Sequence, residues 1–267
     1  MKSIITLVVS LACSLIWAEA KNYPWDVEMK GPQSVYTDAL VELVRHGLPR
    51  PPPDLPGESP IIQANCLETP KNEFYVGVEQ HMIVNSAIPR IDTAISDFAS
   101  YPKLFPGLKH VEVRSQDKNL WVIGFEQHIP VFFIPNVHYE MYYLFDRSQS
   151  NRVLVRYKLK EKTKIKLSDG IILLEKISEN KTRYTEYDFF DADYGMLKTF
   201  APGSIWESSV HDLLLSDLVI KVRAENPELN HASVLEKAKS LLEGIPINEI
   251  AKKRKRFVVP SIEKVPK

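Results

Sequence analysis

Hydrophobic and polar residues alternate along the middle of the chain, and the period of this alternation changes twice. In "FYVGVEQHMIVNS", the apolar residues Val76, Val78, Met82 and Val84 fall on one face of a strand. Apolar residues then return at the i, i+3, i+4 and i+7 spacing of a helical stripe, at Ile91, Ala94, Ile95 and Phe98. The pattern predicts a strand followed by a helix, with Pro89 in the first helical turn.

The segment "SYPKLFPGLKHVEV" separates this helix from the next strand. Tyr101 precedes a proline and is therefore disfavoured in helical geometry, so we expect the helix to stop there. Pro106 and Gly107 predict a turn, and Val111 begins a second strand.

Five further strand candidates follow, separated by short turn signals. They are "NLWVIGFEQHI", "VHYEMYYLF", "RVLVRYKL", "SDGIILLEKI" and "TRYTEYDFF". Such meander spacing predicts an antiparallel sheet. The first three candidates carry bulky apolar residues on one face: Trp121, Ile123, Phe125, Ile129, Val137, Tyr139, Met141, Tyr143, Phe145, Val153, Val155, Tyr157 and Leu159.

The period becomes helical again near Ser204. Ser204 and Glu207 have the spacing of a capping box, and Asn226-Pro227 is a stop signal. The sequence therefore predicts one long helix from Ser204 to Ala224. Its apolar stripe contains Val210, Leu213, Leu214, Leu218 and Val222.

This order of elements resembles the START-like or SRPBCC superfamily, which includes polyketide cyclase-like proteins and coenzyme Q-binding lipid carriers. The resemblance covers residues 73–226 and includes a "D…YP…P" bend, at Asp97, Tyr101, Pro102, Pro106 and Gly107. It implies an α+β helix-grip fold, in which a curved antiparallel sheet wraps around a long C-terminal helix and encloses an internal apolar cavity.

The resemblance also implies that the aromatic face of the sheet binds a ligand. We expect Leu214 and Leu218 on the helix to oppose the sheet residues across the cavity, although ordinary core packing is the alternative. The expected sheet residues are Trp121, Phe125, Tyr139, Met141, Tyr143 and Tyr157.

The expected function is binding or transport of a lipid or another hydrophobic small molecule. One alternative is a cyclase- or hydratase-like enzyme of the same superfamily, which needs a polar group reaching into the cavity. The other is a ligand-free protein-interaction module. We identify no ionisable residue on the aromatic face, and we predict no catalytic residue, metal or cofactor.

Several polar groups could suggest other chemistry. Glu126, His128, His138 and Glu140 lie opposite the aromatic face by alternation, so we interpret them as a solvated outer face, not a metal or acid–base site. "DFFDADYG" lacks the internal glycine and final glutamate of a calcium loop, and we assign it to the end of the last strand.

The first 20 residues predict a signal peptide. A basic start precedes about 15 apolar residues, too few for a membrane span of roughly 20, and Ala18-Glu19-Ala20 is a small-x-small cleavage site. We therefore expect cleavage after Ala20 and a secreted or periplasmic protein.

The composition limits the kinds of partner and of covalent cross-link that the protein can have. With 34 basic and 34 acidic residues the formal net charge is zero, so nothing indicates nucleic-acid binding. Cys66 is the only cysteine outside the predicted signal, which excludes an intrachain disulfide in the mature chain. About 245 remaining residues suffice for one sizeable core.

Two segments flank the predicted domain. Residues 21–72 form an N-terminal extension with the proline-rich run "LPRPPPDLPGESP". Residues 227–267 combine an amphipathic helix, "HASVLEKAKSLLEG", with a basic run from Lys252 to Arg256. We favour a solvated tail; the alternative is weak contact with an anionic membrane, worth about 1 kcal/mol per basic residue. The oligomeric state is not predicted.

Overall fold

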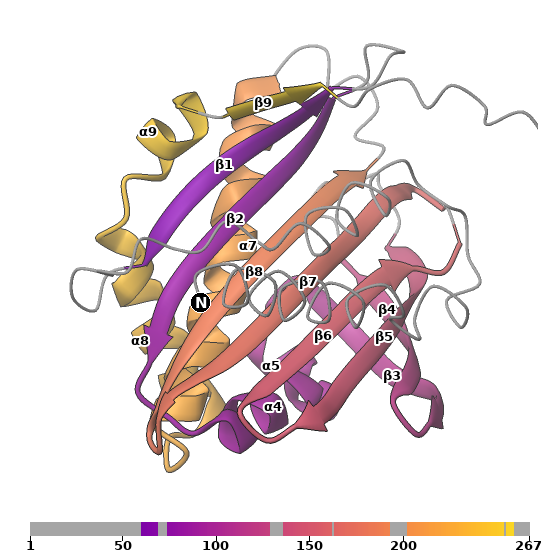
Figure 1. Cartoon of the computed structure of the whole chain (residues 1–267). Helices are drawn as coiled ribbons and strands as arrows, with labels where there is room; N and C mark the ends of the chain where they lie inside the picture. The colour runs from indigo at the N-terminus through magenta and orange to yellow at the C-terminus, as the bar shows by residue number, and fades with distance from the viewer. Residues whose placement is uncertain are drawn as a thin grey trace, which may run out of the picture. The chain divides into compact units, whose positions relative to one another are not determined.

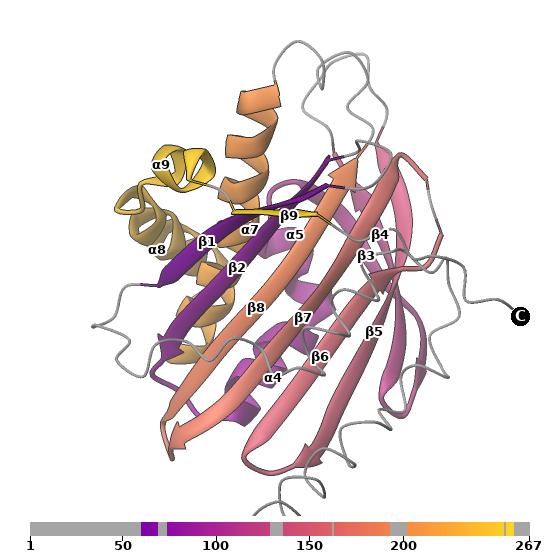
Figure 2. The same cartoon turned by 45° about the horizontal axis from the view of Figure 1, so that its top comes forward.

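The computed structural model describes residues 60–68, 74–128, 136–161, 163–192, 202–253 and 255–258, all within the unit Pro51–Lys267. They form a curved sheet and a set of helices (Figures 1 and 2). The predicted signal peptide, the proline-rich run as far as Ser59 and residues 259–267 lie outside the described residues.

The sheet has nine strands in the order β3-β4-β5-β6-β7-β8-β2-β1-β9 and is not closed into a barrel. Strands β1 to β8 pair antiparallel, and of the described strands β9 alone runs parallel to its neighbour. The strands are β1 (Ile61–Glu68), β2 (Phe74–Val84), β3 (Leu108–Asp117), β4 (Leu120–Gln127), β5 (Val137–Gln149), β6 (Arg152–Leu159), β7 (Ile165–Ser178), β8 (Lys181–Ala192) and β9 (Lys255–Val258).

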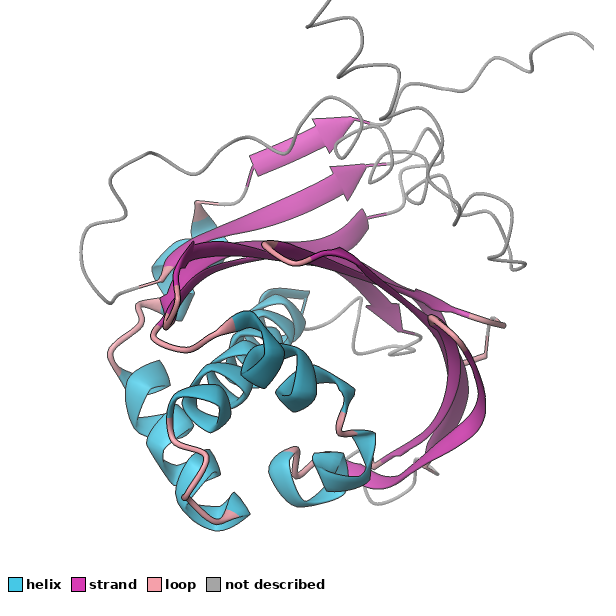
Figure 3. Ribbon diagram, turned by 60° about the horizontal axis from the view of Figure 1, so that its bottom comes forward, coloured by secondary structure: helices cyan, strands magenta, loops and turns pink. Residues whose placement is uncertain are grey.

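The helices lie on the concave side of this sheet (Figure 3). Helix α7, the longest, runs along the concave face and is followed by α8, which packs against it. The helical elements are α4 (Ile88–Ser96), the 3-10 turn η1 (Phe98–Ser100), α5 (Tyr101–Leu104), α7 (Pro202–Glu225), α8 (His231–Glu243) and α9 (Ile247–Lys252). The predicted α+β helix-grip fold is confirmed, because an open, curved antiparallel sheet wraps around a long C-terminal helix.

Two hydrophobic clusters make up the core. The first lies between the concave face and the α4–α5 segment, and it includes all four residues of the predicted helical stripe that begins at Ile91. Of the α7 side chains that the structure describes, only Ile220 and Ala224 belong to this cluster. The second cluster lies mainly between α7 and α8, with Val78 of β2 and Leu104 of α5. Helix α7 is therefore buried on two sides, against the sheet and against α8.

The bend after α4 differs in detail from the prediction. Helix α4 ends at Ser96, with Asp97 as its C-cap, and a separate short helix begins at Tyr101. Pro102 lies in the first turn of this new helix, where its missing N–H leaves no hydrogen bond unmade. The expectation that a helix stops at Tyr101 was therefore wrong, whereas the turn before β3 is confirmed.

The sheet extends beyond the predicted domain at both ends. Residues 61–68, within the predicted N-terminal extension, form β1, and part of the basic run near the C-terminus forms β9 beside it. Helix α7 begins at Pro202, two residues before the predicted start, because proline suits the first helical turn. None of the helices in the described ranges is long and apolar enough to cross a membrane.

Strand β3 forms one edge of the sheet. Most of its side chains are exposed, and its pairing with β4 shifts register twice, between Leu108 and His110 and between Val113 and Ser115.

Candidate functional site

The candidate site is the concave face of β4, β5 and β6. All six predicted sheet residues project from this face into the first hydrophobic cluster or against it. Aromatic rings pack across the strands: the centroids of Phe125 and Tyr139 are 5.2 Å apart, and those of Tyr143 and Tyr157 are 5.5 Å apart. Antiparallel pairing explains these contacts, because Phe125 lies opposite Tyr139 and Tyr143 lies opposite Tyr157 in register.

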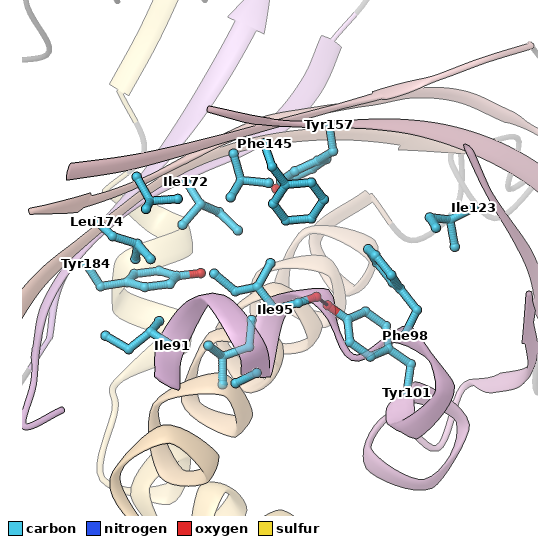
Figure 4. Close-up of a cluster of buried hydrophobic side chains, with 14 of the residues drawn as sticks. Ile91, Ile95, Phe98, Tyr101, Ile123, Phe145, Tyr157, Ile172, Leu174 and Tyr184 are labelled. Carbon is cyan, nitrogen blue, oxygen red and sulfur yellow. Dashed lines mark hydrogen bonds between the residues drawn. The ribbon is translucent and has the colours of Figure 1, made fainter. Parts of the chain in front are cut away.

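The α4–α5 segment covers part of this aromatic face (Figure 4). The ring of Phe98 lies 4.8 Å from that of Tyr143 and 5.9 Å from that of Trp121, measured between centroids. The hydroxyl of Tyr101 donates a hydrogen bond to the carbonyl oxygen of Ile95 at 2.6 Å, which ties α5 to α4. The bend between these helices therefore holds two aromatic rings over the sheet.

Part of the aromatic face remains accessible. Trp121, Tyr139 and Tyr143 are only partly buried, although they point toward the helices and not away from them. Phe105 and Val111, which pack against the same cluster, are also partly buried. Partly buried apolar side chains therefore border the first hydrophobic cluster near β3, β4 and β5.

The two predicted helix residues lie elsewhere. Leu214 and Leu218 are buried in the second cluster, with Val234, Ala238 and Leu242 of α8. The structure therefore does not bring them together with Phe125, Met141 and Tyr143. Ile220 and Ala224 occupy that position on α7 instead.

A buried polar cluster lies next to the aromatic face, at the centre of the sheet. Glu186 of β8 accepts hydrogen bonds from the hydroxyls of Tyr157 and Tyr184, both at 2.6 Å. The Tyr184 hydroxyl also lies 2.9 Å from Oδ1 of Asp217, on α7. The polar cluster therefore links the concave face of β6 and β8 to the long helix.

Burial changes the protonation of these groups. It raises the pKa of Asp217 well above its usual value, and the neighbouring charge of Glu186 raises it further. Burial likewise raises the pKa of the Tyr157 and Tyr184 hydroxyls, which stay protonated and able to donate. Asp217 therefore keeps its proton to higher pH than an isolated aspartate would.

Gly170 makes room for this arrangement. It lies opposite Tyr157 in the β6–β7 register, and the Tyr157 ring covers it so closely that an added Cβ would lie 2.1 Å from Cζ. Only glycine leaves the ring in the position from which its hydroxyl reaches Glu186.

An ion pair connects the α4–α5 bend to α7. The guanidinium of Arg223 donates to the carboxylate of Asp97, which also accepts a hydrogen bond from the Ser100 hydroxyl at 2.7 Å. Burial raises the pKa of Asp97, but the hydrogen bonds from Arg223 and Ser100 outweigh it, and the net shift is downward. This pair fixes the bend that carries Phe98.

The other polar constellations lie outside the site, as expected. His128 and His138 are exposed, Glu126 pairs with His138 in register, and Glu140 forms an ion pair with Lys160 at 2.6 Å. Asp188 lies within β8, so the assignment of "DFFDADYG" to a strand end is confirmed as far as Ala192. Within the described ranges no three His, Cys, Asp or Glu side chains are arranged to hold a metal ion.

Sequence analysis missed Glu186 and Asp217. The available signal was alternation in "RYTEYDF", which places Tyr184, Glu186 and Asp188 on one face of β8. Met82 was predicted to lie on the buried face of its strand, and it pairs with Tyr184. This pairing would have assigned the face that carries Tyr184 and Glu186 to the interior. The statement that no ionisable residue lies on the concave face was therefore wrong.

Comparisons with known proteins give likenesses in fold alone. No protein-family model and no curated protein matches the chain. Solved structures similar to it include human STARD10 (TM-score 0.42, 9% identity, 69% of this chain and 75% of that one). A second is a STAR-related lipid transfer protein from Xanthomonas axonopodis (TM-score 0.40, 8% identity, 71% of this chain and 97% of that one). A third is the Zhui aromatase/cyclase from Streptomyces (TM-score 0.38, 13% identity, 66% of this chain and 88% of that one).

Proposed function

We propose that this protein binds a lipid or another hydrophobic small molecule against the concave face of its sheet and works as an exported carrier. The observation that carries the proposal is the accessible apolar surface of Trp121, Tyr139 and Tyr143, which faces the helices. Apolar surface is stabilised by about 25 cal/mol for each Å² removed from water. A hydrophobic ligand that covered these rings would gain this free energy.

The chemistry of the surface suits such a ligand. Ligand sites are mostly apolar and aromatic, with a few polar groups that fix orientation. Here the aromatic rings adjoin the polar cluster around Glu186. The indole Nε1 of Trp121 is buried and, in the part of the chain that the structure describes, has no hydrogen-bond partner.

Uptake of a neutral hydrophobic dye such as Nile red tests the proposal. Tyr142 and Tyr143 are neighbours on β5 that project to opposite faces, so they form a matched pair. Tyr143→Ala should weaken dye binding several-fold, because aromatic contacts contribute roughly 0.5–1.5 kcal/mol beyond their area. Tyr142→Ala should leave it unchanged.

Native mass spectrometry of the protein from its own host gives the second arm of this test. A bound apolar molecule would support the carrier. No dye uptake together with no bound molecule would refute it and favour the interaction module.

An enzyme of cyclase or hydratase type is a second candidate, favoured by one observation. Such an enzyme needs an ionisable group at the apolar surface, and the Glu186–Asp217 pair supplies one next to Tyr157. The small molecules that copurify with the parent and with Glu186→Gln distinguish the two functions. A carrier would retain the same molecules in both, whereas an enzyme would accumulate its unconverted substrate in the variant.

Export and membrane contact complete the proposal, and both rest on sequence. N-terminal sequencing of the protein from its host should find Lys21 first. Removal of residues 250–267 should reduce co-sedimentation with anionic vesicles if the basic run contacts lipid, and unchanged binding would leave the solvated tail.

A further inference from the structure

The buried polar cluster has a further member on β2. Gln80 lies directly opposite Glu186 in the β2–β8 register, and both project from the concave face. Gln80 is 1% exposed, and its Oε1 atom has no hydrogen-bond partner in the described part of the chain. Its Nε2 atom donates a hydrogen bond to Sδ of Met82 at 3.5 Å. A buried amide oxygen without a donor destabilises the protein unless a ligand supplies one.

Hydrogen-bond acceptors outnumber donors at this place. Two carboxyl groups and the Gln80 carbonyl offer oxygen lone pairs, whereas the donors are the hydroxyls of Tyr157 and Tyr184 and the proton that Asp217 retains.

In the described ranges, no lysine, arginine or histidine side chain forms an ion pair with Glu186 or Asp217. The two nearest cations on α7 are engaged elsewhere: Arg223 pairs with Asp97, and Lys221 donates to the carbonyl of Ile83 and to Glu225. Among the described side chains, this cluster therefore has more acceptors than donors and no cationic partner for Glu186 or Asp217.

We propose that Gln80, Glu186 and Asp217 bind the protonated primary amino group of an amphiphilic ligand whose apolar part lies along Tyr143 and Trp121. An ammonium group supplies three donors, one positive charge and no acceptor, which complements this acceptor-rich cluster. Charge-assisted hydrogen bonds to a buried carboxylate are roughly twice as strong as neutral ones. A ligand with a carboxylate or phosphate group would meet like charge here. The inference rests on the proposed function and names the chemical class of its ligand.

The protonation of Asp217 agrees with this assignment. Its pKa is raised by burial and then by the charge of Glu186. The groups that face it are Glu186, Asp188 and Tyr184 of β8.

Three probes of equal chain length test the inference on the full-length protein: dodecylamine, dodecanol and dodecanoate, with affinities measured by isothermal titration calorimetry. The amine should bind at least tenfold more tightly than the alcohol, and the alcohol more tightly than the carboxylate. Glu186→Gln and Asp217→Asn should each reduce the amine-to-alcohol ratio to near one. Glu175→Gln is the matched control, because Glu175 lies on the opposite face of the neighbouring β7 and pairs with Arg183 at 3.8 Å.

The outcomes separate the two proposals. Equal binding of amine and alcohol by the parent protein would overturn the ammonium site and leave the carrier function intact, and so would a preference for the carboxylate. Binding of none of the three probes would refute the carrier function, and the ammonium site with it. The ratio in the parent decides the question even if a variant fails to fold.

Discussion

Replacement of Gly170 by alanine tests whether the Tyr157 ring is held where it can reach Glu186. The added Cβ would lie 2.1 Å from Cζ, 2.2 Å from the hydroxyl oxygen and 2.5 Å from Cε2 of Tyr157, so the ring must move. Overpacking of this kind costs about 1–3 kcal/mol. Loss of the 2.6 Å hydrogen bond to Glu186 adds to that, since a hydrogen bond to a charged group contributes roughly 1.5–3 kcal/mol. We expect Gly170→Ala to lower the free energy of unfolding by roughly 2.5–6 kcal/mol.

The same substitution should change sign when the ring is absent. In a Tyr157→Ala background the added methyl group meets no ring, and Gly→Ala then stabilises by about 0.4–1 kcal/mol by restricting the unfolded chain. Urea unfolding of the parent, both single variants and the double variant gives the coupling free energy. If Tyr157→Ala does not unfold cooperatively, Tyr157→Val serves as the background. An equal cost of Gly170→Ala with and without the ring would refute the explanation.

Three further predictions concern the ion pair, the carboxyl pair and the second cluster. Asp97→Asn should destabilise the protein at neutral pH. Because the folded-state pKa of Asp97 is lowered, this loss of stability should disappear as the pH falls below about 4. Urea unfolding midpoints from pH 3 to 7 measure the loss, and a loss independent of pH would contradict the prediction. Asp217 has a raised folded-state pKa, so its contribution to stability is full below the ordinary aspartate pKa and is lost as the pH rises. Asp217→Asn, which mimics the protonated form, should therefore gain stability relative to the parent as the pH rises above about 4, and a constant difference would argue against the raised pKa. Leu214→Trp should lower the free energy of unfolding by about 1–3 kcal/mol, because it overpacks the α7–α8 contact, and should leave Nile red uptake unchanged. A stable variant that takes up no dye would instead place the ligand site between α7 and α8.

The order of strands and helices could be predicted because most elements bury one face. Alternation identified the concave residues of β4 and β5, and the helical stripe at Ile91 was confirmed in full. Prediction was weaker where an element is buried on two sides. Every residue from Val153 to Leu159 in β6 is buried, so the pattern there does not separate the faces.

The same cause explains the errors in the site. Helix α7 packs against both the sheet and α8, so its apolar stripe could not show which partner Leu214 and Leu218 contact. Asp217 lies within a run of apolar residues, and the helical pattern there does not indicate whether its side chain is buried or exposed. Its role depends on Glu186 and Tyr184, which are distant in sequence and meet it only where α7 packs against the sheet.

The two edges of the sheet are protected in different ways, and this affects how the protein behaves when concentrated. An edge strand offers free backbone groups to other molecules and can template intermolecular aggregation. Strand β3 carries Lys109, Glu112, Arg114 and Asp117 and two register shifts, all of which oppose such pairing. The β1 edge is instead paired with four residues of β9. Loss of that short strand would uncover a pairing edge, so proteolysis near the C-terminus would make the protein prone to aggregate while its concave face stays intact.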